Sequence, residues 1–306
     1  MSTPHVAVSG RGFLLVVLAS LCWGTSGASG KIVADRTDLG PLDIAWHRMA
    51  IGAVALLAAW ALTRRRSGPT PAISRGTAVR LVLVGAGLAA YQLAYFAAVA
   101  TAGVSIATLV ALGLAPLLIA VGGTLLGHGR PDRATGVALV VALVGLVLLV
   151  GVSAGADTGT TIALGALMAV GSALGYAVVT LAGGGVPAGI PVTLVGFAGG
   201  ALLLTPAALA LGLRTTTEPT ALAVLIYLGL VPSALAYAMF FTGLRTVPGA
   251  VASIVTLLEP LTATALATAF LGERLSAPAL LGGFLVLAAV AGLYLHRLRQ
   301  PSPADV

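Results

Sequence analysis

Long apolar stretches recur along this chain at regular intervals, separated by short polar connections. Each stretch is about 20 residues long, which at about 1.5 Å per residue lets a helix cross a hydrocarbon core of about 30 Å. The pattern predicts ten membrane-spanning helices, at residues 13–33, 42–62, 79–99, 104–126, 134–153, 161–183, 189–211, 220–243, 249–271 and 277–297. None of the connections is long enough to hold a soluble domain.

The two halves of the chain repeat one another. Gly85, Phe96 and Pro116 recur 144 positions later as the same residue types, at Gly229, Phe240 and Pro260. Because each half holds five helices, an odd number, the second half enters the membrane in the opposite sense to the first. We therefore expect an all-α membrane protein of about ten transmembrane helices, built as two inverted five-helix repeats: residues 1–153 with helices 1–5 and residues 154–306 with helices 6–10.

Composition excludes a soluble protein. Hydrophobic residues make up 58% of the chain and charged residues only 8%, against about a quarter in ordinary soluble domains. The mean hydropathy is +1.07. Cys22 is the single cysteine, so neither an intrachain disulfide nor a cysteine metal cluster can form.

The net charge of +7 reports membrane topology. With the N-terminus inside, eleven basic residues lie in inward-facing segments and three, Arg36, Arg214 and Arg274, in outward-facing ones. The positive-inside rule thus places both termini in the cytoplasm, in a multi-pass protein of the cell membrane, and nucleic acid is not needed to explain the charge. A signal peptide is the competing interpretation of the first thirty residues; its removal would leave nine helices and break the repeat.

Short motifs in the first, second and ninth helices resemble a known family. The first contains Trp23-Gly24-Thr25-Ser26 followed by Lys31, the second contains Arg48, and the ninth contains Leu257-Leu258-Glu259-Pro260, followed by Leu271-Gly272-Glu273-Arg274-Leu275. By these motifs the chain resembles the EamA-type transporters of the drug/metabolite transporter superfamily. The resemblance covers essentially the whole chain. The first half departs from the pattern, because Leu126-Gly127-His128 lacks the glutamate expected after Leu-Gly. The resemblance implies ten helices, transport of small metabolites or amino acids, often outward, and no catalytic chemistry or cofactor.

Few ionisable residues lie within the predicted helices: Lys31, Asp43, His47, Arg48 and Glu259. A charge at the centre of a membrane helix costs on the order of 2.5–3.5 kcal/mol on insertion scales, so each needs a partner or a wet cavity. Glu259 precedes Pro260, which permits a kink. Glu259 is therefore a candidate to bind a substrate amine or to carry a coupling proton. The alternative is a neutral carboxyl group that locks two helices together by a hydrogen bond.

His47 and Arg48 are adjacent in the second helix, so they point about 100° apart and only one should face a narrow cavity. Arg48 is the stronger candidate, because its planar guanidinium binds a carboxylate through two N–H groups; an ion pair with Glu259 is the alternative. His47 fits a packed, hydrogen-bonded histidine as well as a site residue. Other roles account for Lys31 and Asp43. Lys31 fits a side chain that extends to the membrane interface, and Asp43 fits the N-cap of the second helix.

Aromatic and amide side chains complete the predicted substrate site: Trp23, Tyr91, Gln92, Tyr95, Tyr176 and Tyr237. Sites inside membrane proteins combine apolar walls with a few polar groups, and Tyr91 and Tyr95 share one helix face. Filling of gaps between helices explains each aromatic residue equally well. Gly171 and Gly175 form a small-residue pair that favours close helix packing.

Together these features predict a secondary transporter, favouring export, that moves small metabolites such as amino acids or amphipathic compounds by alternating access. Its partners would be the lipid bilayer, the substrate and protons, with a homodimer left open and neither cofactor nor metal expected. A non-transporting receptor or a lipid scramblase is the alternative. An intramembrane enzyme fits less well, because no nucleophile, acid–base pair or metal cluster gathers at one depth.

Overall fold

The computed structural model describes residues 10–63, 71–150, 160–271 and 276–298, and the regular elements in these ranges are helices. The first half contains α1 (Gly10–Gly24), α2 (Ser26–Arg36), α3 (Pro41–Thr63), α4 (Arg75–Leu125) and α5 (Arg133–Val150). The second half contains α6 (Thr160–Gly184), α7 (Val192–Ala210), α8 (Pro219–Gly229), the π-helical turn η3 (Leu230–Leu235), α9 (Ala236–Gly243), α10 (Gly249–Val255), α11 (Leu258–Leu271) and α12 (Ala277–Leu298).

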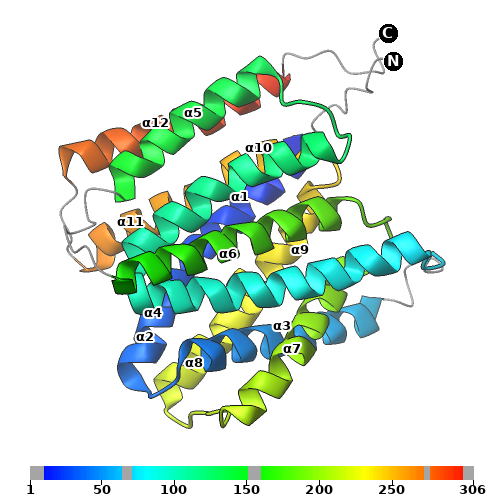
Figure 1. Ribbon diagram of the computed structural model, residues 1–306, viewed down its shortest axis with the longest axis vertical. Coiled ribbons are helices and arrows are strands. Elements are labelled where there is room, and N and C mark those ends of the chain that lie inside the picture. Colours follow the sequence, from blue (N-terminus) through cyan, green and yellow to red (C-terminus); the bar gives the residue numbers. More distant parts are fainter. Residues whose placement is uncertain (1–9, 64–70, 151–159, 272–275, 299–306) are drawn as a thin grey trace.

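These elements confirm the predicted all-α membrane fold with two inverted repeats. Nine helical segments in the described part of the chain are long and apolar enough to span a membrane, and α5 is a shorter apolar helix. α4 holds two of the spans, joined at Gly103, whose φ of 82° lies in the region that favours glycine. Figure 1 shows the second part of α4 turning back from the first, with α6 between the two parts in this view.

Several spans are broken. α1 and α2 meet at Thr25, α8 passes through η3 into α9, and α10 is separated from α11 by Thr256 and Leu257. Pro232 lies within η3, and Pro260 follows the last break by three residues. Proline removes a backbone donor and favours such interruptions.

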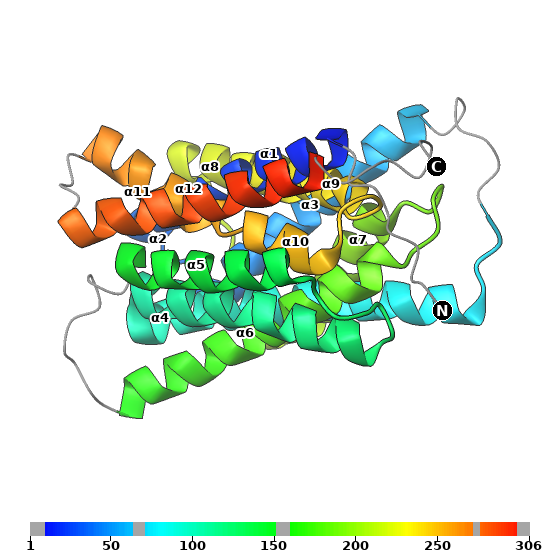
Figure 2. The same cartoon turned by 90° about the horizontal axis from the view of Figure 1, so that it is seen from above.

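The two halves pack against each other along their lengths. α4 lies against α6 and α7, α5 against α12, and α1 against α9 and α11, as Figures 1 and 2 show. Small residues permit these approaches: a Cβ added to Gly175 would lie 2.9 Å from the Gly87 carbonyl oxygen. α1 is thus an integral part of the bundle, and its side chains Phe13, Val16 and Ala19 are buried.

Candidate functional site

Aromatic side chains from both halves meet in the middle of the bundle. Trp23 of α1 lies with its ring centroid 4.8 Å from Tyr237 of α9 and 6.3 Å from Tyr176 of α6. Phe240, one turn after Tyr237, lies 5.2 Å from Trp23. All of these rings are buried. The predicted residues Trp23, Tyr176 and Tyr237 therefore form one cluster, which we call the aromatic cluster, together with Phe240.

The α4 residues extend this cluster. The Tyr91 ring lies 5.6 Å from Tyr176 and 6.4 Å from Tyr95, as expected for residues that share a helix face. The Tyr95 hydroxyl is 3.0 Å from the Thr108 hydroxyl, within hydrogen-bond distance. Gln92 is buried beside Tyr91 along the helix. α6 comes close to α4 at Gly175, where an added Cβ would lie 2.9 Å from the Tyr91 backbone nitrogen. This close approach brings these side chains together.

Some buried polar atoms at this level have no hydrogen-bond partner among the described residues. They include Trp23 Nε1, Gln92 Nε2 and Ser172 Oγ. A buried donor without a partner costs about 1–3 kcal/mol, so buried polar groups are nearly always bonded to protein, water or ligand. Within the described part of the chain, these atoms are therefore unpaired polar groups at the aromatic cluster.

Arg48 of α3 reaches the same region. Its Nε–H donates to the Ser233 hydroxyl in η3 at 3.1 Å, and its guanidinium carbon lies 5.8 Å from the centre of the Phe96 ring, in cation–π range. Arg48 is only 6% exposed. Within the described chain its Nη atoms have no hydrogen-bond partner, and the ion pair with Glu259 that was one expectation is not formed.

Glu259 is the second residue of α11, directly after the break that ends α10. Its backbone N–H donates to the Thr256 carbonyl at 2.9 Å. The side chain is half-buried, and its carboxyl oxygens have no hydrogen-bond partner in the described ranges, so the expected lock between helices is not seen. An added Cβ at Gly24 would lie 2.8 Å from the Glu259 carbonyl, which places α1 against this turn.

His47 contacts residues of its own helix. Its Nδ1 is 2.8 Å from the carbonyl oxygen of Asp43, and its ring contacts Trp46 edge-on at 5.2 Å. Asp43 is not the N-cap but the third helical residue, and its carboxylate accepts from the backbone N–H of Gly40 at 2.9 Å, in the manner of a capping box. The Lys31 side chain, Glu273 and Arg274 lie outside what the structure describes.

Sequence reasoning missed Ser233, Phe96 and Phe240 as site residues. Ser233 is fully buried and bonded to Arg48, whereas in the sequence it is one serine in an apolar block. Pro232 before it was the available signal, since proline inside a membrane span marks backbone groups that need new partners.

A cavity of about 450 Å³ opens at the end of the bundle that holds the connection after α4 and the connection between α9 and α10. His128, Arg130 and Arg245 line its mouth, and the buried Thr180 lines it deeper inside. Thr180 is one helical turn from Tyr176, so this cavity approaches the aromatic cluster from one side.

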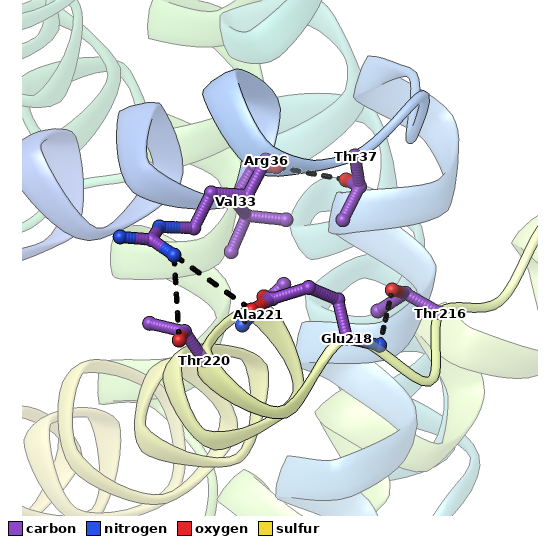
Figure 3. A network of polar contacts seen from close by, with 7 residues as sticks. All are labelled: Val33, Arg36, Thr37, Thr216, Glu218, Thr220 and Ala221. Carbon is purple, nitrogen blue, oxygen red and sulfur yellow. Dashed lines mark hydrogen bonds and ion pairs between the residues drawn. The ribbon is translucent and has the colours of Figure 1, made fainter.

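At the opposite end of the bundle, exposed polar contacts join the two halves, and we call these contacts the outer clasp. Arg36 at the end of α2 pairs with the Glu218 carboxylate at 3.7 Å and contacts the Thr220 hydroxyl at 3.5 Å (Figure 3). Nearby, Arg214 donates from Nη1 to the Asp38 carbonyl at 2.9 Å. The backbone N–H of Ala221, which donates to the Glu218 carboxylate, holds the pKa of that carboxyl below its usual range, and Arg36 adds to this effect.

Comparison with known proteins identifies relatives over nearly the whole chain. The model of the EamA-like transporter family matches residues 10–151 and again residues 163–295. A protein of Bacillus subtilis (strain 168), the uncharacterized transporter YwfM, is 32% identical over 90% of this chain and 93% of its own length. The uncharacterized inner membrane transporter YicL of Salmonella typhimurium is 24% identical over 96% of this chain and 98% of its own. A crystal structure with 21% identity superposes on 94% of this chain and 99% of its own, with a TM-score of 0.77.

Proposed function

The chain belongs to the EamA-like transporter family, and from this premise we propose that it is a secondary transporter that moves small metabolites through alternating access between its two halves. The observation that carries the proposal is the shared central site. Trp23, Arg48 and Tyr91 come from the first half, and Tyr176, Tyr237 and Glu259 come from the second. A site built by both repeats changes its access when one half rocks against the other.

The two ends of the bundle differ in the way that alternating access requires. One end has the cavity that reaches Thr180, and the other is held by the outer clasp. The distribution of arginines favours an orientation with both termini on the cytoplasmic side of the cell membrane. In that orientation the cavity opens inward and the clasp faces outward. The structure then corresponds to an inward-facing state.

The side chains at the site favour substrates that combine a charged group with an apolar part. The Nη groups of Arg48 suit a carboxylate, and the aromatic cluster suits an apolar side chain. We propose amino acids or amphipathic compounds as the substrate class, and export as the direction, with the inward cavity as the entrance. The site residues come from a single chain, so the proposal does not depend on a homodimer.

Purified protein in liposomes tests this function. We expect time-dependent movement of at least one compound from a panel of radiolabelled amino acids and amphipathic cations, above empty liposomes. Binding without movement would indicate a receptor, translocation of a fluorescent phospholipid would indicate a scramblase, and chemical conversion of the compound would indicate an enzyme.

We expect the outer clasp to open in each transport cycle. In a Cys22→Ser background, we expect that joining Arg36→Cys to Glu218→Cys with a short, reducible bis-thiosulfonate reagent stops transport, because α2 can no longer separate from α8. Reduction of the reagent should restore the rate. The measurement is the initial transport rate before and after each treatment.

Each single-cysteine variant, treated in the same way, is the control for modification alone. Full transport by the cross-linked double variant would exclude the clasp as a gate. Because the pKa of Glu218 is lowered, its carboxylate stays ionised at neutral pH, and the Arg36–Glu218 pair is lost only when the pH falls below the ordinary range of a glutamate carboxyl.

A further inference from the structure

The π-helical turn η3 exists where Pro232 interrupts the span of α8 and α9. In a regular α-helix the carbonyl of Leu228 would accept from the N–H of residue 232, four positions later. Pro232 has no N–H, so that carbonyl loses its regular donor. The Ser233 hydroxyl donates to the Leu228 carbonyl at 2.7 Å instead.

This hydrogen bond fixes the direction of the Ser233 hydroxyl. A serine hydroxyl has one proton, and here the proton is used on Leu228. The lone pairs of the same oxygen are then left to accept, and the Arg48 Nε–H donates to it at 3.1 Å. Ser233 is fully buried, which keeps water from replacing either partner.

Arg48 is held from a second direction by Phe96. The guanidinium carbon lies 5.8 Å from the centre of that ring, so the group has a cation–π contact as well as one fixed hydrogen bond. Of the five N–H groups of an arginine, Nε–H is used and the four on Nη1 and Nη2 remain. Among the described residues these four have no hydrogen-bond partner.

We propose that Ser233 is a positioning residue, which through its bond to Nε sets the direction in which the Arg48 Nη groups meet an anionic group of the substrate. The inference rests on the proposed function, since it assigns Ser233 a part in the recognition step of that transporter. Pro232 contributes to this positioning. Because it offers no N–H to the Leu228 carbonyl, that carbonyl accepts from the Ser233 hydroxyl instead. A shift of Arg48 would lose the paired geometry that binds a carboxylate or phosphate through two N–H groups.

The positioning itself can be measured without any transported compound. In protein labelled with ¹⁵N-arginine, the Nε–H resonance of Arg48 is identified by its loss in Arg48→Lys. We expect Ser233→Ala to shift this resonance and to speed its exchange with water. Ser233→Cys, which has a similar shape but a weak acceptor, should give a smaller change in the same direction if alanine impairs folding.

Ser253→Ala is the matched control. Ser253 is also fully buried, and its hydroxyl bonds to the Ala250 carbonyl of its own helix at 2.9 Å. This variant should leave the Arg48 resonance unchanged. An unchanged resonance in Ser233→Ala and Ser233→Cys would overturn the proposal.

The functional consequence is tested with an anionic compound that the liposome panel shows to be transported. We expect Ser233→Ala to raise its apparent KM about tenfold with little change in maximal rate, because a hydrogen bond to a charged group is lost. In an Arg48→Lys background, which has no Nε–H, the same substitution should change KM less than about twofold. Equal effects in both backgrounds would show a merely structural role. If no compound is transported, the proposed function fails while the resonance test still decides the positioning.

Discussion

Replacing Arg48 by alanine is expected to reduce transport of an anionic or zwitterionic substrate by roughly 30-fold or more, because truncating one partner of a buried charge pair costs about 2 kcal/mol or more. Arg48 is 6% exposed and lies among side chains of both halves, so a substrate carboxylate bound there would be shielded from water. The initial rate in liposomes, measured over a range of substrate concentrations, gives this loss as a ratio of kcat/KM.

Two further variants separate the charge from the geometry. Arg48→Lys keeps the positive charge but not the planar fork, and we expect it to recover only part of the activity. Arg11→Ala removes an exposed arginine of α1 and should transport at the wild-type rate. Undiminished transport by a well-folded Arg48→Ala variant would reduce Arg48 to a structural role.

The fold could be predicted from the sequence because a membrane helix is defined by its length and apolar composition alone. The predicted ends of α3, at residues 42 and 62, differ from Pro41 and Thr63 by one residue each. Apart from the kink that Pro260 permits, the interruptions were not predicted. Whether a proline such as Pro232 ends a helix, bends it or creates a π-turn depends on which neighbour satisfies the freed backbone groups, and that neighbour is distant in sequence.

The site could be predicted in part, for a similar reason. A charged or aromatic residue inside a span is visible in the sequence, and Trp23, Arg48 and Tyr237 were predicted as site residues in this way. Their partners were not, because Ser233 is 185 positions from Arg48 and carries no charge. His47 was also a candidate from its residue type, and its ring contacts Trp46 and the Asp43 carbonyl, so its part in the site stays a prediction.

The helix interruptions and the site occur together. The break at Thr25 follows Trp23 by two residues, η3 contains Ser233, and the break at Thr256 and Leu257 precedes Glu259. The Tyr227 hydroxyl donates to the Thr25 hydroxyl at 2.8 Å, which ties the first break to the span that contains the second. Irregular backbone inside a membrane is tolerated only where protein or a cavity satisfies it, and transporters place their binding sites at such points. We therefore expect the changes between inward-facing and outward-facing states to be largest at these breaks.

Glu259 is the residue that we propose to carry a coupling proton, because its half-buried carboxyl group has no hydrogen-bond partner in the described ranges and lies at one of these breaks. One proton per substrate across one pH unit supports an accumulation ratio of about ten, since one pH unit corresponds to about 1.36 kcal/mol. We expect wild-type protein in liposomes to reach a ratio of this order and to lose it when a protonophore collapses the gradient.

The variant Glu259→Gln keeps the size of the side chain but cannot release a proton, so we expect its accumulation ratio to stay near one at every imposed pH gradient. Exchange of labelled for unlabelled substrate, which needs no net proton movement, should persist. Asp38→Asn alters an exposed carboxylate outside the spans and should accumulate substrate as the wild type does. Gradient-driven accumulation by Glu259→Gln at the wild-type ratio would assign the coupling to another group. Loss of both accumulation and exchange by a well-folded variant would mean that Glu259 is needed for substrate binding or for the conformational change, and that coupling is not its separate role.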